Sequence, residues 1–585
     1  MFEIGPFQLD ESARVLRLAE REIALQPRVF DLLTYLVRNR ARVVSKDELL
    51  DKLWPDVTVT DNSLQRAVSN LRAALRHGGM ENAIRNFPKS GYRFCLEPTS
   101  DAAGNVQAVR SSPDQREEAR RAIREQRWSE AIELFRQIDT ASSLTADDLD
   151  GWALALQCLG QPSDAVPVLV RSIAMYSEEE DYERAAEGVA TLSTIHLERG
   201  EVALAKGWLS RARELANHVP ESPAYGRVLW LASRIAAFDG DPQEALKLAD
   251  AAYQSGRACG DYKIEAMGLM YRGFYRLSLG ETREGLADQD HAAALALSKK
   301  PDPVTGGILY CNILWACRTF GDWARANQWT VGYQRFCTES RMGFFGSCQL
   351  HRAEVLGVHG SLIEARAHIE DALSRLSDDA PWALGDAYRV LGDIHAAIGD
   401  LDAASIAYDQ SYALGWNPEP GRAMLLLERG EAEAAYSSLE RSLIGQSWWT
   451  LQRQGMLLAY LALVAAHAGK HEKAKSLIDE LAGQEKRWPM PSIRALTNEA
   501  SALLARERGE VNEALRHLHL ARQLWTSIDC RLNATRLRMQ IAALQLKLGD
   551  KMGAGAELRI AFEVVNALKS EKMLRQCEIL QQSLG

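Results

Sequence analysis

One segment of the chain, from Asn62 to Cys95, has a charge unlike the rest. It contains six basic residues and one acidic residue, whereas the whole chain of 585 residues has a net charge of −9. Binding to nucleic-acid phosphates requires such a local excess of cations, and the acidic remainder would be repelled. The segment therefore predicts a localised nucleic-acid contact, and its charged residues are Arg66, Arg72, Arg76, Glu81, Arg85, Lys89 and Arg93.

The apolar spacing over about 62–76 predicts a helix with one face free for this contact. At 100° per residue, Leu64, Val68, Leu71 and Leu75 share one side and must face a core. Arginine, glutamine and asparagine can pair bidentately with base edges in a major groove that admits a helix. Ala73 also lies on the opposite side, and the predicted DNA contacts at the opposite and flanking positions are Gln65, Arg66, Ser69, Asn70, Arg72 and Arg76.

The surrounding elements follow the order of a winged helix-turn-helix domain. Alternating apolar residues predict short strands near the start of the chain, within 2–9, 15–18 and 23–25. Helices are predicted from Pro27 and from a capping box that opens at Ser45. Two further strands are predicted over about 84–95, which would form the wing, with Lys89 and Ser90 at its tip and Arg93 on its second strand.

The first 98 residues resemble the OmpR/PhoB-type DNA-binding domain, and most resemble its CadC-like subgroup. The resemblance implies double-stranded DNA as partner and a contact with RNA polymerase through the 55–61 loop. Family arginines at the positions of Arg72 and Arg93 can anchor the fold instead of the nucleic acid, so both roles stay open. The motifs are Leu25-Gln-Pro-Arg-Val-Phe-Asp-Leu-Leu33, Val44-Ser-Lys-Asp-Glu-Leu-Leu50, Trp54-Pro-Asp56, Val59-Thr-Asp-Asn-Ser-Leu64, Leu71-Arg-Ala-Ala-Leu75 and Gly91-Tyr-Arg-Phe94.

Evenly spaced glycines organise the rest of the chain. All but one of their intervals are 39 to 41 residues, and the exception is the 31-residue step from Gly399 to Gly430. A fixed period in this range predicts a stacked solenoid of supersecondary units. We expect a break in the superhelix at the short step. The eleven glycines are Gly160, Gly200, Gly240, Gly280, Gly321, Gly360, Gly399, Gly430, Gly469, Gly509 and Gly549.

Each copy predicts two helices joined by a tight turn. Glycine ends the first helix because it adopts a left-handed conformation without strain. An alanine stands five residues after each glycine, with Gly285 as the one substitute. A small residue stands seven before, with Leu314 as the exception. Small side chains at these two positions let the paired helices approach closely.

This pattern, as in Gly240-Asp-Pro-Gln-Glu-Ala245, resembles the tetratricopeptide repeat. The period is longer than the family's roughly 34 residues, which implies helices of about 17 residues. Long repeats of this kind are similar to the sensor superhelices of bacterial transcription activators. We therefore expect a mostly α chain: a DNA-binding domain over 1–98, a linker over 99–113, and a helical superhelix over 114–585 that ends in a capping helix. A degenerate first copy has Gln126 at the glycine position.

The repeat register implied by this resemblance predicts a concave surface on the array. Positions ten, six and three before each glycine would line it. Aromatic, arginine and acidic side chains together suit a small molecule, a peptide or a protein partner, although aromatic residues in stacked helices are more often packing. The predicted surface comprises Trp230, Arg234, Phe274, Trp315, Arg318, Glu354, Arg389 and Asp393.

Other classes of function find little support in the sequence. Phosphate-binding loops, zinc-protease and hydrolase motifs do not occur, so we expect no enzyme, no catalytic residue and no cofactor. Nine scattered cysteines show no CxxC pair, which predicts no metal site and a reducing compartment. The longest apolar run, 456–466, is too short to cross a bilayer, and no signal peptide opens the chain. A cytoplasmic location without membrane attachment follows.

Three functions remain open at this point. The leading one is a sequence-specific transcription regulator whose array senses a ligand, binds a protein or self-associates into a homo-oligomer. The second is a protein-interaction scaffold with a degenerate winged domain. The third is a catalytic helical-repeat protein. The basic excess on the predicted reading helix favours the first.

Overall fold

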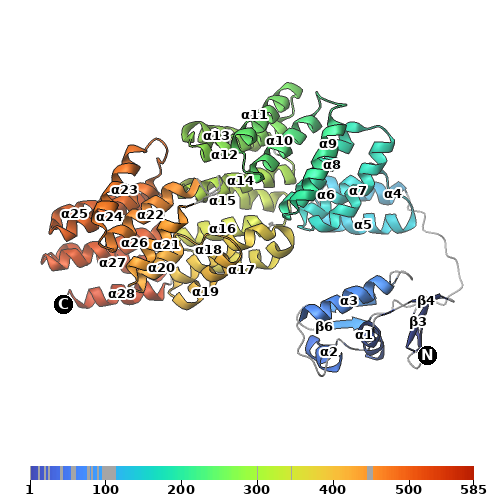
Figure 1. The fold of residues 1–585 in the computed structure, drawn as a ribbon, viewed down its shortest axis with the longest axis horizontal. Coiled ribbons are helices and arrows are strands. Elements are labelled where there is room, and N and C mark those ends of the chain that lie inside the picture. Colours follow the sequence, from blue (N-terminus) through green and yellow to red (C-terminus); the bar gives the residue numbers. More distant parts are fainter. Residues whose placement is uncertain are drawn as a thin grey trace. The chain divides into compact units, whose positions relative to one another are not determined.

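The computed structural model divides the chain into two compact units, residues 1–108 and 109–585, both drawn in Figure 1. The predicted linker, 99–113, lies outside the described residues except for Pro113, where the first helix of the second unit begins. Structural statements cover the chain apart from residues 1, 5, 11–13, 19–20, 24, 26, 40–41, 43, 54–60, 76–79, 81–82, 88–90, 95–112, 300, 344–345, 445–451, 569 and 585, and apart from some side chains within helices and strands.

The first unit opens with a small antiparallel sheet in which consecutive strands pair. Its inward side chains alternate with outward ones, because successive residues of a strand point to opposite faces. Phe7 and Leu9 pair with Leu18 and Leu16, and Phe7, Leu9 and Leu16 are at most 1% exposed. The strands are β1 (Phe2–Ile4), β2 (Phe7–Asp10), β3 (Val15–Leu18) and β4 (Arg21–Ile23).

Three helices and a hairpin complete this unit. The predicted order of strands, three helices and a two-stranded wing is confirmed. A single apolar core joins the sheet, the helices and the hairpin, and Leu33, Leu49 and Leu71 are fully buried in it. The elements are α1 (Pro27–Arg38), α2 (Lys46–Leu53), α3 (Asp61–Leu75), β5 (Ile84–Phe87) and β6 (Gly91–Phe94).

The second unit is a stack of antiparallel helical hairpins, which confirms the predicted solenoid of tetratricopeptide-like repeats. In Figure 1 it runs from the cyan helices α4 and α5 to the red helix α28. Its first half comprises α4 (Pro113–Arg124), α5 (Trp128–Ala141), α6 (Ala146–Cys158), α7 (Pro162–Glu178), α8 (Tyr182–Glu198), α9 (Val202–Ala216), α10 (Pro223–Phe238), α11 (Pro242–Cys259), α12 (Tyr262–Leu279), α13 (Thr282–Lys299), α14 (Pro303–Phe320) and α15 (Trp323–Glu339).

The stack continues to the carboxyl-terminal helix. A short 3₁₀ helix, Pro381–Ala383, precedes α18. The second half comprises α16 (Gly346–His359), α17 (Leu362–Asp379), α18 (Leu384–Ile398), α19 (Leu401–Ala413), α20 (Gly421–Glu428), α21 (Ala432–Ser442), α22 (Gln454–His467), α23 (His471–Gly483), α24 (Pro491–Glu507), α25 (Val511–Ser527), α26 (Arg531–Lys547), α27 (Lys551–Leu568) and α28 (Glu571–Gln582).

The repeated glycines have the predicted left-handed backbone. All eleven have φ between 71° and 109°, a region that costs other residues free energy. Gln126 of the degenerate first copy has φ of 58°, as expected for a residue at the glycine position. The ten alanines five residues later are fully buried, Ala245 and Ala514 among them.

The hairpin of α12 and α13 has the closest helix contact that this pattern produces. Glycine occupies both positions of the contact, Gly273 and Gly285. A Cβ atom on Gly273 would lie 2.6 Å from the carbonyl oxygen of Gly285. The two backbones therefore touch, and Arg272 joins the hairpin further through Asp288, at 2.7 Å.

Distant hairpins are also joined, along a line that we call the inter-turn seam. Its hydrogen bonds connect hairpins five apart in the stack, such as α4–α5 with α14–α15. Five hairpins therefore complete one superhelical turn, and the next turn lies against the first. The bonds of the seam are Trp128 Nε1 to the Ser340 carbonyl, 3.1 Å; Thr282 Oγ1 to the Arg487 carbonyl, 2.7 Å; Ser492 Oγ to the Gly321 carbonyl, 2.8 Å; and Ser570 Oγ to the Ala397 carbonyl, 3.3 Å.

A buried amide side chain, Gln452, connects two turns near the middle of the seam. It donates to the Phe274 carbonyl at 3.0 Å and to Ser278 Oγ at 2.8 Å, and it accepts from Thr319 at 2.8 Å. Gln452 is fully buried. Because a buried polar group is costly without partners, these bonds fix how the two turns meet.

The short step from Gly399 to Gly430 shortens one hairpin without interrupting the stack. Its first helix, α20, has only 8 residues, yet α20 still packs on α19 and α22. Ala423 of α20 and Ala435 of α21 belong to the large apolar cluster of the array, while Leu425 belongs to a smaller one with Tyr408. The helices stay in contact through the short step, and the predicted break in the superhelix is not confirmed.

Substitution at the Gly273 contact tests whether close helix approach stabilises the array. Gly273→Ala should lower the free energy of unfolding by about 1–3 kcal/mol, because the added methyl group overpacks the hairpin. Gly207→Ala is the matched control, since nothing lies within 4 Å of that position in α9. It should raise stability by up to about 1 kcal/mol through helix propensity. Urea unfolding followed by circular dichroism measures both, and equal effects would contradict the contact argument.

Candidate functional site

Helix α3 has the predicted division into a buried and an open side. Leu64, Val68, Leu71 and Leu75 are each at most 2% exposed. Asn70, on the opposite side, is exposed. The predicted orientation of the reading helix is therefore confirmed in its core-facing half.

Most of the other predicted DNA contacts have side chains outside the described part of the structure. Asn70 stands clear of the core and can reach a base edge or a phosphate. The 55–61 loop is described only at Asp61, where α3 begins. The predicted contacts outside the described residues or side chains are Gln65, Arg66, Ser69, Arg76, Lys89 and Ser90.

Arg72 is a hairpin anchor in this structure. Its Nε and Nη2 atoms donate to the carbonyl oxygen of Ile84 at 3.3 and 2.8 Å. These contacts support the fold-anchoring role of Arg72, one of the two roles that the sequence left open. Arg93 is half-buried on β6, opposite Arg85 in the strand register.

The base of the wing is held against the segment before α2. Val44 and Tyr92 exchange two backbone hydrogen bonds, at 2.8 and 2.9 Å. Gly91 is required beside them, because a Cβ atom there would lie 1.9 Å from the Val44 carbonyl oxygen. The wing therefore starts from a fixed position on the helical core.

An ionic cluster fixes α1 against α2. Ser45 Oγ accepts from the backbone N–H of Glu48 at 3.1 Å, which is half of the predicted capping box. The Glu48 carboxylate accepts from Tyr35 at 2.7 Å and from Arg42 at 2.8 Å. Hydrogen bonds from Arg42 and then Tyr35 lower the pKa of Glu48 to about 2. Glu48 thus joins α2 to Tyr35 of α1 and to Arg42.

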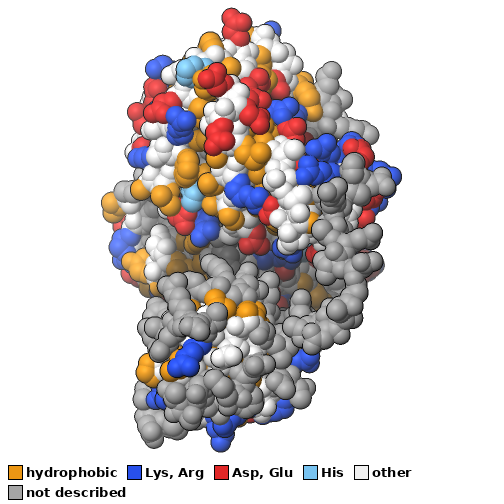
Figure 2. Space-filling model, turned by 90° about the vertical axis from the view of Figure 1, so that its right-hand side faces the viewer, with side chains coloured by type: hydrophobic (Ala, Val, Ile, Leu, Met, Phe, Trp, Pro, Cys, Tyr) orange, Lys and Arg blue, Asp and Glu red, His pale blue; other side chains and the backbone are white. Residues whose placement is uncertain are grey.

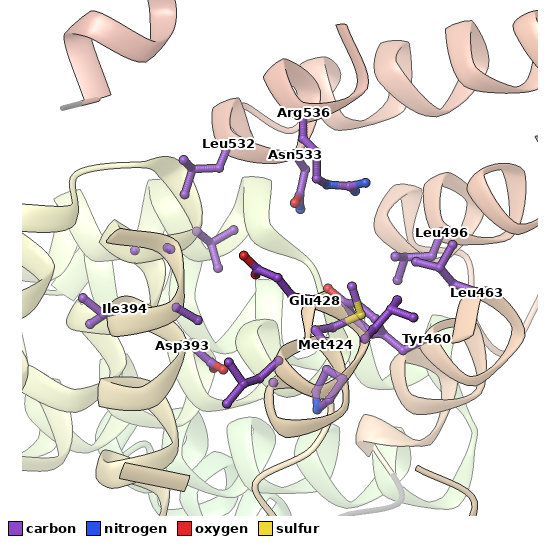
Figure 3. A pocket seen from close by; sticks show the side chains of 18 of the residues that line it. Asp393, Ile394, Met424, Glu428, Tyr460, Leu463, Leu496, Leu532, Asn533 and Arg536 are labelled. Carbon is purple, nitrogen blue, oxygen red and sulfur yellow. The ribbon is translucent and has the colours of Figure 1, made fainter. Parts of the chain in front are cut away.

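The second unit contains a cavity of about 810 Å³ inside its carboxyl-terminal superhelical turn. Helices α14, α16 and α18 supply one wall, and α20, α22, α24, α26 and α28 supply the other. Figure 3 shows Asp393 and Ile394 of α18 across the space from Leu463 and Leu496, with Asn533 of α26 above them. This volume lies in the range of ligand pockets, roughly 300–1,000 Å³.

A buried ionic cluster lies at one end of this cavity. Arg389 is 2.8 Å from Glu354, Asp386 and Asp393, and Arg318 is 2.9 Å from Asp386. Burial alone would raise the pKa of Asp386, but the Arg318 and Arg389 guanidinium groups hold that pKa below its usual range. Burial raises the pKa of Asp393 to about 6. These charges are compensated by one another and hold α14, α16 and α18 together.

Half of the predicted concave surface contributes to this cavity. Arg318, Glu354, Arg389 and Asp393 line it. The prediction is wrong for Trp230, Arg234, Phe274 and Trp315, which serve packing instead. The first three are at most 8% exposed.

The packing contacts of these four side chains explain the error. Trp230 packs edge-on against Tyr271 at 5.5 Å, and the Arg234 guanidinium covers the Trp230 ring at 5.2 Å. Trp315 is half-buried against Trp382, at 5.4 Å between ring centroids. Aromatic side chains in stacked helices thus fill the space between neighbouring hairpins.

The residues of the opposite wall were not named in the sequence prediction. Met424, Arg453, Tyr460 and Arg536 belong to it. Met424 stands six residues before Gly430, as the predicted register requires, whereas Arg453, Tyr460 and Arg536 come from later hairpins that the curvature of the superhelix brings across the cavity. Nothing in the local repeat pattern signals that placement, although a repeat curvature known in advance would have done so.

None of the helices described combines the length and apolar character needed to cross a bilayer. Among the described side chains, no group of three or more His, Cys, Asp or Glu residues is arranged to hold a metal ion.

Comparison with known families matches residues 20–94 to the family described as "Transcriptional regulatory protein, C terminal". The first unit is thus an OmpR/PhoB-type winged helix. It is 29% identical over 95 residues to the transcriptional activator CadC of Escherichia coli, which is 16% of this chain and 19% of CadC. It is 32% identical over 93 residues to the phosphate regulon regulatory protein PhoB of Rhizobium meliloti, which is 16% of this chain and 41% of PhoB.

These relatives each match 14 to 16% of this chain. A Bacillus subtilis transcriptional regulatory protein, YvcP, is 37% identical over 81 residues, 14% of this chain and 34% of YvcP. The matches therefore span less than half of each relative. A solved structure of the APC/C hetero-tetramer Cut9–Hcn1 covers 81% of this chain and 96% of its own at 12% identity, with a TM-score of 0.34.

The two roles of Arg72 can be separated by experiment. Arg72→Ala should weaken the wing by about 1.5–3 kcal/mol, because two charge-assisted hydrogen bonds to Ile84 are lost. Hydrogen exchange of the β5 and β6 amides in the full chain measures this loss. Asn70→Ala, the neighbouring exposed position, should leave exchange unchanged. Unaltered exchange in Arg72→Ala would contradict the fold-anchoring role and leave DNA contact as the role of Arg72.

Proposed function

We propose that this protein is a sequence-specific, double-stranded DNA-binding transcription regulator. The observation that carries the proposal is a family-matched winged helix whose α3 turns an exposed face, with Asn70 on it, away from the core. In this proposal Arg66 and Asn70 read base edges, while Arg76, Lys89 and Ser90 bind phosphates or an adjacent minor groove.

The local charge supports confinement of DNA binding to the first unit. Six basic residues and one acidic residue lie between Asn62 and Cys95, while the chain as a whole has a net charge of −9. On the array face turned to the viewer in Figure 2, acidic, basic and apolar side chains are intermixed. A surface of mixed charge of this kind adds little long-range attraction for DNA.

The array is, in this proposal, the part that responds to a ligand or a protein partner. Its cavity and its long, continuous surface are the features that favour this role. Contact of the 55–61 loop with RNA polymerase, self-association of the array and a cytoplasmic location belong to the same proposal. The alternative is a scaffold with a degenerate winged domain, and the next experiment distinguishes that scaffold from the regulator.

Arg66→Ala should weaken operator binding by about 1–3 kcal/mol and relax discrimination between bases, because a bidentate base contact is lost. Genome-wide mapping with the intact protein supplies the operator, and fluorescence anisotropy at physiological salt measures affinity. Arg211→Ala on α9, at a side chain 49% exposed in the array, should change nothing. Operator binding that is unchanged by Arg66→Ala would refute the proposed reading face.

Removal of the array tests whether it controls DNA binding. We expect the intact chain and a chain ending near residue 98 to occupy the same sequence motif, with occupancy that differs between growth conditions only for the intact chain. Chromatin immunoprecipitation with sequencing compares the two. Equal occupancy at all sites in all conditions would show that the array does not regulate DNA affinity.

A further inference from the structure

The ionic cluster at one end of the cavity leaves one donor incompletely paired. Arg318 is 2% exposed and binds Glu354 and Asp386, yet its buried Nη2 atom has no hydrogen-bond partner among the described residues. A buried donor without a partner costs about 1–3 kcal/mol. An oxygen acceptor that came within hydrogen-bond distance of this atom would remove that cost.

Arg453 adds a second guanidinium at the same end, from the opposite wall. Among the described residues it donates to the carbonyl oxygen of Glu419 and forms no ion pair. Burial and then the nearby Arg389 guanidinium lower the pKa of Arg453 to about 10. Its charge is therefore less well compensated than those of Arg318 and Arg389, which each bind carboxylates.

The remaining lining is mostly apolar and is adaptable in shape. Met424 and Met456 line it together with Leu463, Leu496 and Trp525. Methionine side chains fill irregular space and contact aromatic groups favourably. Figure 3 shows Met424 beside Tyr460, with Leu463 and Leu496 next to them. A ligand here would need an apolar body as well as an acidic group.

We propose that this cavity binds a small organic anion, whose acidic group lies between Arg318 and Arg453 and whose apolar body lies against Met424, Met456 and Leu463. This inference rests on the proposed sensing role of the array and gives it a ligand class. Arg318 and Arg453 are binding residues in it, and Arg389 positions Arg318 through their shared carboxylates.

Binding of such a ligand would act on the inter-turn seam. Arg318 adjoins Thr319, and Arg453 adjoins Gln452; Thr319 and Gln452 share a hydrogen bond of 2.8 Å. Gln452 also bonds the preceding turn at Phe274. An anion between the two arginines would therefore add a bridge beside the seam, and a ligand that binds only the folded array stabilises it.

Binding can be tested on the full chain with two carboxylic acids of defined shape. The probes are 4-phenylbutyrate and decanoate, each compared with its alcohol, and acetate serves as an anion without an apolar body. Isothermal titration calorimetry measures the affinities. Both acids should bind at least tenfold more tightly than their alcohols, and acetate should not saturate. Acids that bind no more tightly than their alcohols would overturn the proposal.

Two variants locate the site. Arg453→Gln should weaken acid binding at least tenfold and leave alcohol binding within twofold, whereas Arg494→Gln, at a side chain 58% exposed on α24, should change neither. Met424→Trp narrows the apolar part of the cavity and should weaken binding of acids and alcohols alike at least tenfold. If Arg453→Gln does not fold, Met424→Trp alone tests whether the acids bind in this cavity. Unaltered acid binding in either folded cavity variant would place the site elsewhere and overturn the inference.

Operator binding by the same preparations separates this inference from the proposed function. Acid binding that obeys these expectations in a protein without operator affinity would uphold the cavity and reject the regulator. Operator binding without acid binding would uphold the regulator and reject the cavity as a binding site for acids. If both hold, the acids should change the operator affinity of the wild-type chain and not that of Met424→Trp.

Discussion

Close approach of two helix backbones is the constraint on which the second unit depends. The left-handed turn at each glycine and the small residues on either side of it place the two helices of a hairpin in contact, most closely at Gly273 and Gly285. That contact sets the angle at which one hairpin stacks on the next. Repeated along the chain, the angle produces a superhelix whose sixth hairpin meets the first and whose eleventh meets the sixth. The cavity lies inside the second of these turns.

Polar groups hold the closed superhelix where apolar packing alone would leave it free to slide. Gln452 and Ser492 are fully buried, and each bonds a backbone carbonyl of the preceding turn. The ionic cluster of Arg318, Arg389 and their carboxylates adds directional contacts next to the cavity. Buried polar contacts of this kind are worth little in net stability but tolerate only one arrangement. The first unit uses the same device on a smaller scale, where Arg72 holds the wing and Glu48 holds α1 against α2.

Local patterns predicted most of the fold because each repeat forms by local rules. The period of the glycines gave the hairpins, and the apolar spacing of α3 gave its buried side at Leu64 and Leu71. Sites that depend on distant contacts were only half predicted. Arg318 and Arg389 follow from the repeat register, whereas Arg453 meets them across a turn of the superhelix. Trp230 and Phe274 were misjudged because register alone does not distinguish an aromatic ring that lines a groove from one that fills the space between hairpins.

The seam also limits how such an array can change its length. In an open solenoid each repeat contacts only its neighbours, so single repeats can be gained or lost at little cost. Here Trp128, Thr282 and Ser570 each require a partner five hairpins away. An insertion or deletion of one hairpin in the middle would offset the pairings that span it, and buried polar groups would lose their partners together. Viable changes in length are therefore restricted to the two ends of the stack, or to whole turns of five hairpins.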